Sequence, residues 1–273
     1  MFVPRLVASD LDGTLLRSDH SVSPRTLAML DRLRAEGIPF VMVTGRPRRW
    51  LTPVLEQTGP RGPVVCANGA LVVDPDNERV LAEWAIPAAV LASVVERVRA
   101  AVPALAFAVE RGPLMLHEEQ YPVRWDLALE EERTSELADI VAGPASKLLI
   151  RSIDDADPHD VYAQVTATLG GDVTPTHSGF PGLIEVAAAG VTKATGLAWV
   201  AEYLSIDPAR VVAFGDMPND ATMLRWAGRG VVVADAHPDA FAAADTVTLG
   251  NDADGVAAYV EELLDVTDRA TPG

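Results

Sequence analysis

The chain has 273 residues, with 39 acidic against 22 basic side chains, a formal net charge of −17, 49% hydrophobic residues and one cysteine. This composition is that of a globular protein with one or two domains. The excess of acidic groups argues against nucleic acid as a partner, because phosphate backbones bind basic surfaces. A local cationic pocket for one small anion remains compatible with that charge.

No segment approaches the roughly 18 consecutive apolar residues of a membrane span, and the start lacks the basic and apolar regions of a secretory signal. Cys66 cannot form a disulfide within the chain, which fits a reducing compartment. We therefore expect a cytoplasmic protein without a membrane partner. No pattern in the sequence indicates an oligomeric state.

The first part of the chain alternates strand and helix patterns. Apolar runs over Arg5–Ser9 and Pro39–Val43 predict two strands, each ending in a polar turn. The segment from Ser23 to Gly37 predicts a helix, because serine before proline is a start signal, leucines recur on one face and glycine ends the pattern. Asn68-Gly69 between two short apolar runs predicts a β-hairpin.

The same alternation returns near the end of the chain. Helices are predicted over Lys193–Leu204, Pro218–Trp226 and Asp252–Leu264, and strands over Arg210–Phe214 and Gly230–Ala234. Strand, helix and strand in this order predict a parallel sheet covered by helices. We therefore expect an α/β protein with a Rossmann-like three-layer core and a mostly parallel sheet.

The middle of the chain breaks this alternation. Its predicted helices cover Pro87–Ala101 and Pro158–Thr168, its predicted strands cover Ala104–Val109, Leu114–Leu116, Lys147–Ser152, Asp172–Thr176 and Leu183–Ala187, and an acidic stretch runs from Asp126 to Glu136. We interpret residues 84–187 as an inserted α+β domain, and residues 1–83 and 188–273 as two halves of one core.

Asp10 and Asp12 follow the first predicted strand. In an extended backbone, residues two apart project to the same side, so the two carboxylates would repel one another unless a cation or a shared proton relieves them. Oxygen ligands of this kind suit Mg²⁺. The alternative is a solvated acidic turn or a side-chain cap.

Three further motifs lie where other predicted elements meet. Thr44-Gly45 offers a hydroxyl and an amide to a phosphate oxygen, or forms an ordinary turn. Lys193 opens a predicted helix, where a cation is unfavourable unless an anion binds there; the alternative is a solvated lysine. Asp216 and Asp220 place carboxylates after another strand, or cap a helix. All of these groups would share one edge of the sheet, where open α/β sheets bind ligands.

In combination, the motifs resemble those of the haloacid dehalogenase-like (HAD) phosphatases, in the Cof-type branch with a large α/β cap. The resemblance covers nearly the whole chain. The matching segments are Asp10-Leu11-Asp12-Gly13-Thr14-Leu15, Val43-Thr44-Gly45-Arg46-Pro47, Cys66-Ala67-Asn68-Gly69-Ala70, Gly190-Val191-Thr192-Lys193 with Gly196-Leu197, and Phe214-Gly215-Asp216 with Asn219-Asp220. Four family motifs in order, with an insertion between the second and the third, make a specific signal.

The resemblance implies a Mg²⁺-dependent phosphatase of small phosphorylated metabolites, with sugar phosphates favoured, that works through an aspartyl-phosphate. Asp10 would be the nucleophile and Asp12 the general acid and base. Mg²⁺ would bind the side chains of Asp10 and Asp216 and the carbonyl of Asp12, with Asp220 close by or behind these ligands. The groups implied to hold the phosphoryl oxygens are Leu11, Thr44, Gly45, Lys193 and Asn219, of which Thr44 and Lys193 also count as catalytic.

The resemblance also implies that the inserted segment selects the substrate. Arg46 is the candidate for a substrate contact, because it adjoins the predicted phosphate turn; a salt bridge within the core is the alternative. For the polar residues His117, Arg151, His177 and Glu185 of the insertion, we expect solvated surface positions instead of substrate contacts.

Two other functions are compatible with the same architecture. A phosphomannomutase-like mutase would return the phosphoryl group to its sugar before water attacks. A ligand-binding protein would keep the fold without chemistry, but such a protein needs no nucleophile, and the intact Asp10, Asp12, Lys193 and Asp216 argue against it.

Overall fold

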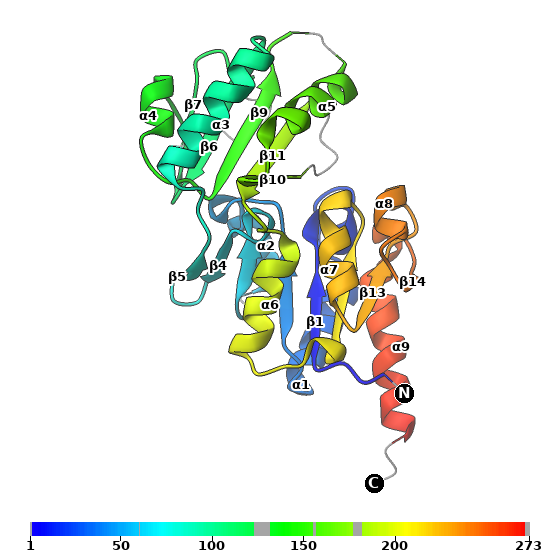
Figure 1. Ribbon diagram of the computed structural model, residues 1–273. Coiled ribbons are helices and arrows are strands. Elements are labelled where there is room, and N and C mark those ends of the chain that lie inside the picture. Colours follow the sequence, from blue (N-terminus) through cyan, green and yellow to red (C-terminus); the bar gives the residue numbers. More distant parts are fainter. Residues whose placement is uncertain (1, 60, 123–131, 155–156, 177–181, 271–273) are drawn as a thin grey trace. The chain divides into compact units, whose positions relative to one another are not determined.

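The computed structural model describes residues 2–59, 61–122, 132–154, 157–176 and 182–270. The chain divides into two compact units, which we call the core unit (Met1–Ala82 with Thr192–Gly273) and the inserted unit (Glu83–Val191). Each unit contains its own sheet (Figure 1). The predicted α/β class with a mostly parallel sheet is confirmed.

The core unit is built on a sheet of eight strands within the described residues, in the order β14-β13-β12-β1-β2-β3-β4-β5. The strands are β1 (Leu6–Ser9), β2 (Phe40–Val43), β3 (Val64–Cys66), β4 (Leu71–Asp74), β5 (Arg79–Glu83), β12 (Val211–Gly215), β13 (Arg229–Val232) and β14 (Thr246–Val247). The strands from β14 to β3 pair in parallel, whereas β4 is antiparallel to β3. The β3–β4 pair is the predicted hairpin.

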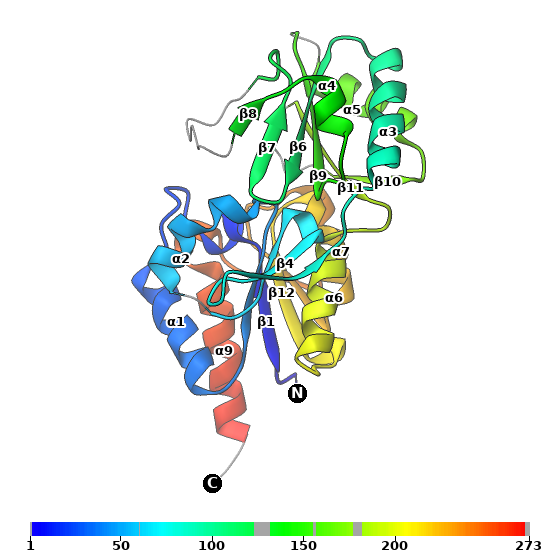
Figure 2. The same cartoon turned by 90° about the vertical axis from the view of Figure 1, so that its left-hand side faces the viewer.

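Helices cover both faces of this sheet. The helices of the core unit are α1 (Pro24–Ala35), α2 (Thr52–Thr58), α6 (Lys193–Tyr203), α7 (Ala221–Trp226), α8 (Pro238–Phe241) and α9 (Gly255–Ala270). Figure 2 shows α1 and α9 on one side of the sheet and α6 and α7 on the other, and each pair packs together. Because both faces are covered, every residue of β1, β2 and β12 is buried.

Local signals determine where α1 begins and ends. The side chain of Ser23 accepts a hydrogen bond from the amide of Thr26 at 3.0 Å, and Pro24 occupies the first turn. Gly37 follows the helix with a φ of +69°, a conformation that glycine adopts without a Cβ clash. The predicted helix between Ser23 and Gly37 is confirmed.

Two other predicted helices begin later than expected. The segment predicted to start at Pro218 first forms a 3₁₀ turn over Pro218–Asp220, and α7 follows it. The helix predicted from Asp252 starts at Gly255, because Asp254 has a φ of +56° and interrupts the helical backbone.

Sequence analysis also missed several short elements, because they lack the length for a periodic signal. These are α2, α8, β5 and β14, and in the inserted unit α4 and β8.

The inserted unit has a six-stranded sheet among its described residues, in the order β10-β11-β9-β6-β7-β8. Its elements are α3 (Ala88–Ala101), β6 (Leu105–Arg111), β7 (Leu114–His117), β8 (Glu132–Thr134), α4 (Leu137–Val141), β9 (Lys147–Ser152), α5 (Pro158–Leu169), β10 (Val173–Thr176) and β11 (Leu183–Ala188). Neighbouring strands are antiparallel except β7 and β8. The N-terminal part of the predicted acidic stretch lies outside the described residues.

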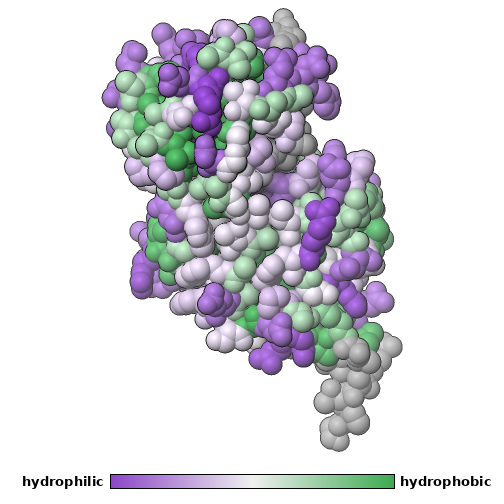
Figure 3. Space-filling view, viewed as in Figure 1, coloured by the Kyte–Doolittle hydropathy of each residue, from purple (hydrophilic) through white to green (hydrophobic). Residues whose placement is uncertain are grey.

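Helices α3, α4 and α5 lie on one face of this second sheet (Figure 1) and bury an apolar cluster against it. The cluster includes Phe107 of β6, Leu148 of β9 and Ile184 of β11. On the outside of α3 and α4, hydrophobic residues reach the surface (green in Figure 3) and line a groove that includes Ala92 and Leu137.

Within the part of the chain that the structure describes, no helix has both the length and the apolar character needed to span a membrane.

Gly69 joins the β3–β4 hairpin to the start of α6. It has a φ of +97°, and a Cβ at this position would lie 1.8 Å from the carbonyl oxygen of Thr192. Thr192 caps α6 and immediately precedes Lys193, so the hairpin and the first turn of α6 are in backbone contact. The absence of a side chain at position 69 therefore helps to fix where Lys193 enters the core unit.

Substitution of Gly69 tests this close backbone approach. Gly69→Ala should lower the free energy of unfolding by about 3–5 kcal/mol, because the new Cβ adds a backbone clash to the strain of a positive φ. Gly37→Ala is the matched control, since Gly37 also has a positive φ but no atom lies within 4 Å of its Cβ position. Its cost should be about 1 kcal/mol. Urea denaturation measures both, and equal losses would contradict the inferred contact.

Candidate active site

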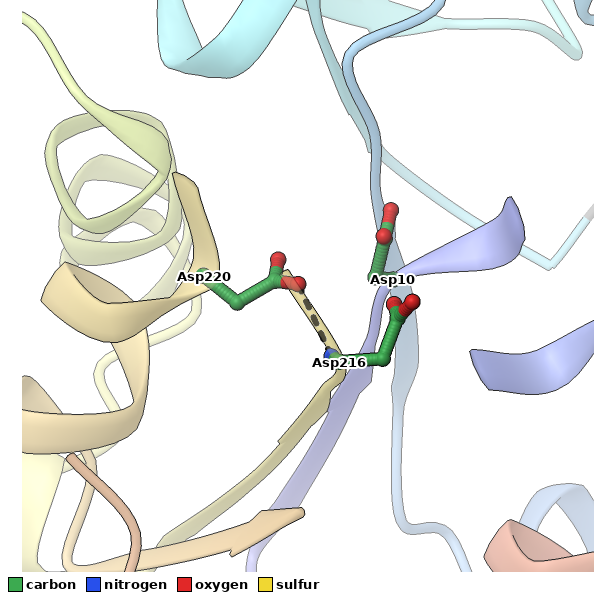
Figure 4. Close-up of side chains that lie close together, drawn as sticks. All are labelled: Asp10, Asp216 and Asp220. Atoms are coloured by element: carbon green, nitrogen blue, oxygen red, sulfur yellow. Dashed lines mark hydrogen bonds between the residues drawn. The ribbon is translucent and has the colours of Figure 1, made fainter. Parts of the chain in front are cut away.

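Three buried aspartates lie together at the carboxyl ends of two paired strands. Asp10 follows β1 and Asp216 follows β12, and these strands run in parallel with Ser9 opposite Phe214. Asp220 comes from the 3₁₀ turn before α7. One carboxylate oxygen of each aspartate lies within 4.8 Å of those of the other two, and Figure 4 shows the three groups converging.

The ammonium group of Lys193 lies between two of these aspartates. Its Nζ is 2.8 Å from Oδ1 of Asp10 and 2.6 Å from Oδ1 of Asp220. Only 1% of Lys193 is exposed. Lysine is almost never buried without a partner, and here the two aspartates are its partners. The predicted start of α6 is confirmed, and the lysine that opens it points into the core unit and not into solvent.

Asp220 holds the lysine and the adjoining backbone at the same time. Its Oδ1 accepts from Lys193, and its Oδ2 accepts from the amides of Asp216 at 3.0 Å (dashed in Figure 4) and Met217 at 2.9 Å. Both carboxylate oxygens are therefore engaged by the protein. Asp220 therefore holds Lys193 and the backbone of Asp216 and Met217 in place.

Burial and mutual repulsion shift the protonation of the cluster. Burial raises the pKa of Asp10 well above its ordinary value; Lys193 opposes this rise, and the nearby Asp220 and Asp216 add to it. Burial, followed by the charge of Asp220, raises the pKa of Asp216 to about 6, against the effect of a 2.7 Å hydrogen bond from the Thr14 hydroxyl. Burial disfavours the charged lysine, but Asp10 and Asp220 outweigh it and raise the pKa of Lys193.

The same cluster has the properties of a divalent-metal site. It presents three carboxylates against one ammonium, so a dication would remove the excess negative charge that raises the carboxyl pKa values. Carboxylate oxygens are also the donors that hard cations such as Mg²⁺ and Ca²⁺ accept. The carboxylate of Asp12 is not part of this group.

The carboxylate of Asp12 instead pairs with Arg46. Arg46 donates from Nε to Oδ2 at 2.7 Å and from Nη2 to Oδ1 at 2.5 Å. Of the two roles considered for Arg46, this structure shows the salt bridge. His20, which sequence analysis did not single out, places its Nδ1 3.6 Å from Oδ1 of Asp12. Nothing in the sequence around His20 indicated this proximity.

The turn after β2 and the turn before α7 meet through Asn68. The Nδ2 of Asn219 donates to Oδ1 of Asn68 at 3.0 Å, and a Cβ at Gly45 would lie 3.0 Å from the same oxygen. Thr44 is buried, and its hydroxyl oxygen accepts from the amide of Arg46 at 3.0 Å. Sequence analysis placed Asn68 only in a hairpin turn, because no local signal links it to a residue so far along the chain.

The polar residues of the inserted unit differ from expectation. Arg151 and Glu185 were expected to be solvated, and this is wrong: they are 3% and 4% exposed. Burial is tolerated because Glu185 pairs with Lys147 and Arg151 lies against the Tyr121 hydroxyl. His117 is half-buried, with its Nδ1 2.9 Å from the carbonyl oxygen of Glu118. His177 lies outside the described residues.

Residues 7–260 match the haloacid dehalogenase-like hydrolase family. The chain belongs to this family. The predicted resemblance is therefore confirmed, and the aspartates and the lysine described above stand in the segments that carried it.

Phosphatases are among the proteins most similar to this HAD-like hydrolase. The 5-amino-6-(5-phospho-D-ribitylamino)uracil phosphatase YitU of Bacillus subtilis is 28% identical over 274 residues, which cover 96% of this chain and 98% of that protein. A phosphoglycolate phosphatase of Natronomonas pharaonis is 33% identical over 265 residues, covering 97% and 96%. A solved HAD-superfamily phosphatase structure from Bacteroides thetaiotaomicron has a TM-score of 0.82 and 26% identity, covering 96% and 95%. These relatives confirm the prediction of a phosphatase of this family.

The raised pKa of Asp216 predicts how the stability of the metal-free protein depends on pH. Because the folded-state pKa of about 6 exceeds the unfolded value of 3.8, the folded state binds more protons between these limits, and stability falls as the pH rises through them. Asp216→Asn removes this titration. In EDTA, the variant should exceed the wild type in stability above pH 6 by up to about 3 kcal/mol, and by little below pH 4.

Urea denaturation in EDTA from pH 4 to pH 7.5 measures this difference. At pH 7.5, added Mg²⁺ should stabilise the wild type more than the variant, because a ligand that binds only the folded state stabilises it. A stability difference that does not change with pH, or that grows as the pH falls, would contradict the environment described for Asp216.

Proposed function

We propose that this HAD-family phosphatase is a Mg²⁺-dependent enzyme that hydrolyses phosphomonoesters of small metabolites, with sugar phosphates favoured, through an aspartyl-phosphate on Asp10. The observation that carries this proposal is the buried contact at the end of β1 between Asp10, the proposed nucleophile, and the ammonium of Lys193. The relatives support small phosphorylated metabolites as the substrates, since one is a 5-amino-6-(5-phospho-D-ribitylamino)uracil phosphatase and another is a phosphoglycolate phosphatase.

In the first step, a carboxylate oxygen of Asp10 would form a bond to phosphorus while the ester P–O bond breaks. The electron pair of that bond goes to the leaving oxygen, which takes a proton from the carboxyl group of Asp12. Lys193 supports this step because its charge favours the ionised form of Asp10, against the effect of burial. The products are an alcohol and the aspartyl-phosphate.

In the second step, water would attack the phosphorus of the aspartyl-phosphate. Asp12, now ionised, takes a proton from the attacking water, and the bond between phosphorus and the Asp10 oxygen breaks. Inorganic phosphate leaves, Asp10 is again a carboxylate and Asp12 is again protonated. Two carboxyl groups two residues apart would thus have different roles because their surroundings differ.

Donors around Asp10 would hold the phosphoryl oxygens in both steps. Lys193 uses two of its three N–H groups on carboxylates in the described contacts, which leaves one for a phosphoryl oxygen. The Thr44 hydroxyl oxygen accepts from an amide, and its proton can be donated. The backbone amides assigned to the same task are those of Leu11, Gly45 and Asn219. Fixed donors of this kind supply most of the catalysis of phosphoryl transfer.

We assign the metal to the side chains of Asp10 and Asp216 and to the carbonyl of Asp12. When bound, Mg²⁺ would neutralise charge on the phosphoryl group and reduce its repulsion from the nucleophile. We assign Asp220 to holding Lys193, because both of its oxygens already accept hydrogen bonds from the protein.

The expected partner is a small anion in a reducing, cytoplasmic compartment. Cys66 is a buried cysteine outside any disulfide of the described chain, which fits such a compartment. The net charge of −17 disfavours nucleic acid as a substrate, but a single phosphate can bind at a local cation such as Lys193.

Phosphate release from p-nitrophenyl phosphate, with Mg²⁺ or with EDTA, tests the proposed function. The wild type should turn over only with a divalent metal, and Asp10→Asn should lower kcat at least about 1000-fold, because an amide is a poor nucleophile. Asp239→Asn is the matched control, since this aspartate is exposed and lies outside the cluster. Its kcat should be unchanged.

The same assay separates the alternatives. A mutase would require a hexose bisphosphate for its activity, and a ligand-binding protein would release no phosphate. Substantial turnover by Asp10→Asn would reject this residue as the nucleophile, provided that circular dichroism shows a folded variant.

We propose further that residues 84–187 select the substrate, because every residue assigned to the chemistry belongs to the core unit. Replacement of this segment by a short Gly/Ser linker should lower kcat/KM at least about 100-fold for the best substrate in a screen of phosphorylated metabolites. The loss for p-nitrophenyl phosphate should be much smaller. A cooperative melt must first show that the shortened chain folds. Equal losses for both substrates would instead make the inserted unit part of the catalytic machinery.

A further inference from the structure

The carboxylate of Asp12 is held in a defined orientation by one arginine. Both oxygens accept from Arg46, Oδ2 from Nε at 2.7 Å and Oδ1 from Nη2 at 2.5 Å. Two parallel hydrogen bonds between a guanidinium and a carboxylate fix the plane as well as the position of the acid group. A single hydrogen bond or a lysine would leave that plane free to rotate.

Arg46 is itself fixed by its surroundings. Its amide donates to the Thr44 hydroxyl oxygen at 3.0 Å, and its carbonyl oxygen accepts from the amide of Ala67 at 3.0 Å. At the other end of the side chain, Nη1 lies 3.4 Å from the carbonyl oxygen of Trp50. Arg46 is thus held through its backbone, and its guanidinium has one contact besides those to Asp12.

Without Arg46, little in the described structure would orient Asp12. His20 also lies near the carboxylate, but its Nδ1 is 3.6 Å away, beyond hydrogen-bond distance, and its side chain is 73% exposed. The side chain of Asp12 is 37% exposed, so it has room to rotate. Each of its oxygens has a second lone-pair direction, which leaves a place for a transferred proton while Arg46 stays bound.

We propose that Arg46 is a positioning residue that orients Asp12 towards the leaving oxygen, and not a group that binds the substrate. This inference rests on the proposed function, in which Asp12 exchanges the proton with the leaving group. A general acid acts only when its proton lies within hydrogen-bond reach of the acceptor. An arginine that fixes the carboxylate plane would therefore contribute to the rate without touching the substrate.

The proposal predicts that the effect of Arg46 depends on the leaving group. Phenyl phosphate and p-nitrophenyl phosphate are similar in size, but phenoxide is the more basic leaving group and needs the proton from Asp12 more. Arg46→Ala should lower kcat/KM for phenyl phosphate about 100-fold, and for p-nitrophenyl phosphate less than about fivefold. A role in substrate binding would instead raise KM for both esters by the same factor, and that outcome overturns the proposal.

Two further single variants separate geometry from charge. Arg46→Lys keeps the positive charge but loses the two-pronged contact, so it should remain close to Arg46→Ala in its loss on phenyl phosphate. Recovery of the wild-type rate by lysine would overturn the proposal. Arg48→Ala is the matched control from the same segment, because Arg48 is half-buried and its side chain donates only to the carbonyl oxygen of Glu78 among the described contacts. It should leave both rates unchanged.

A double variant tests whether Arg46 acts through Asp12. In an Asp12→Asn background, adding Arg46→Ala should cause no further loss on phenyl phosphate, because the group being oriented is already gone. A second loss of about 100-fold would show that Arg46 acts independently of Asp12, and would overturn the proposal.

A crystal structure of Arg46→Ala gives a readout that does not depend on turnover. The Asp12 carboxylate should leave its present orientation or occupy several, whereas an unchanged orientation would overturn the proposal. If the wild type hydrolyses neither ester, the proposed function fails on its own assay. The crystal structure would still decide whether Arg46 orients Asp12.

Discussion

The ammonium of Lys193 lies buried between the carboxylates of Asp10 and Asp220, and the geometry of the core unit depends on this contact. A buried charge is tolerated only with close partners of opposite sign, and removing one member of such a group leaves the others uncompensated. The start of α6 must therefore lie beside the ends of β1 and β12. The close approach of Gly69 to Thr192 is one of the backbone contacts that hold it there.

The same requirement explains the glycines around the aspartates. Gly13 has a φ of +78°, and a Cβ at this position would lie 2.4 Å from Oδ2 of Asp216. A Cβ at Gly215 would lie 2.4 Å from the Cβ of Asp220. Only residues without a side chain let these turns approach closely enough for the carboxylates to share one small volume. Burial, together with the charges of the neighbouring aspartates, raises the pKa of Asp10 and Asp216, and a cation at this place would relieve the excess negative charge.

In the proposed mechanism, Asp10 and Asp12 have identical side chains but different roles, and their surroundings differ accordingly. Asp10 is 5% exposed and contacts a lysine inside the acidic cluster, whereas the side chain of Asp12 is 37% exposed and pairs with an arginine outside it. A nucleophile needs a fixed position and compensated charge, and a proton carrier needs access to a leaving group and to water. The two groups are separated by one residue in the turn that follows β1, and their different partners would account for the different roles proposed for them.

Much of this arrangement was readable from the sequence. The strand ends before Asp10, Thr44 and Asp216, the start of α6 at Lys193 and the Asn68-Gly69 hairpin follow from signals within a few residues. Parallel strand order then implies that groups after successive strands share one edge. The α/β class and the family motifs could be predicted on this basis.

The side-chain pairs were decided only by the tertiary structure. The contact of Arg46 with Asp12 spans 34 positions, and that of Asn219 with Asn68 spans 151, so no local pattern records either one. Arg151 and Glu185 were expected in solvent because charged residues are mostly exposed, but their partners in the folded chain made burial possible. Local sequence determines where a backbone turns and a polar group is presented. Which group it meets depends on how the whole chain packs, and here that packing sets the charge, the orientation and hence the chemistry of the site.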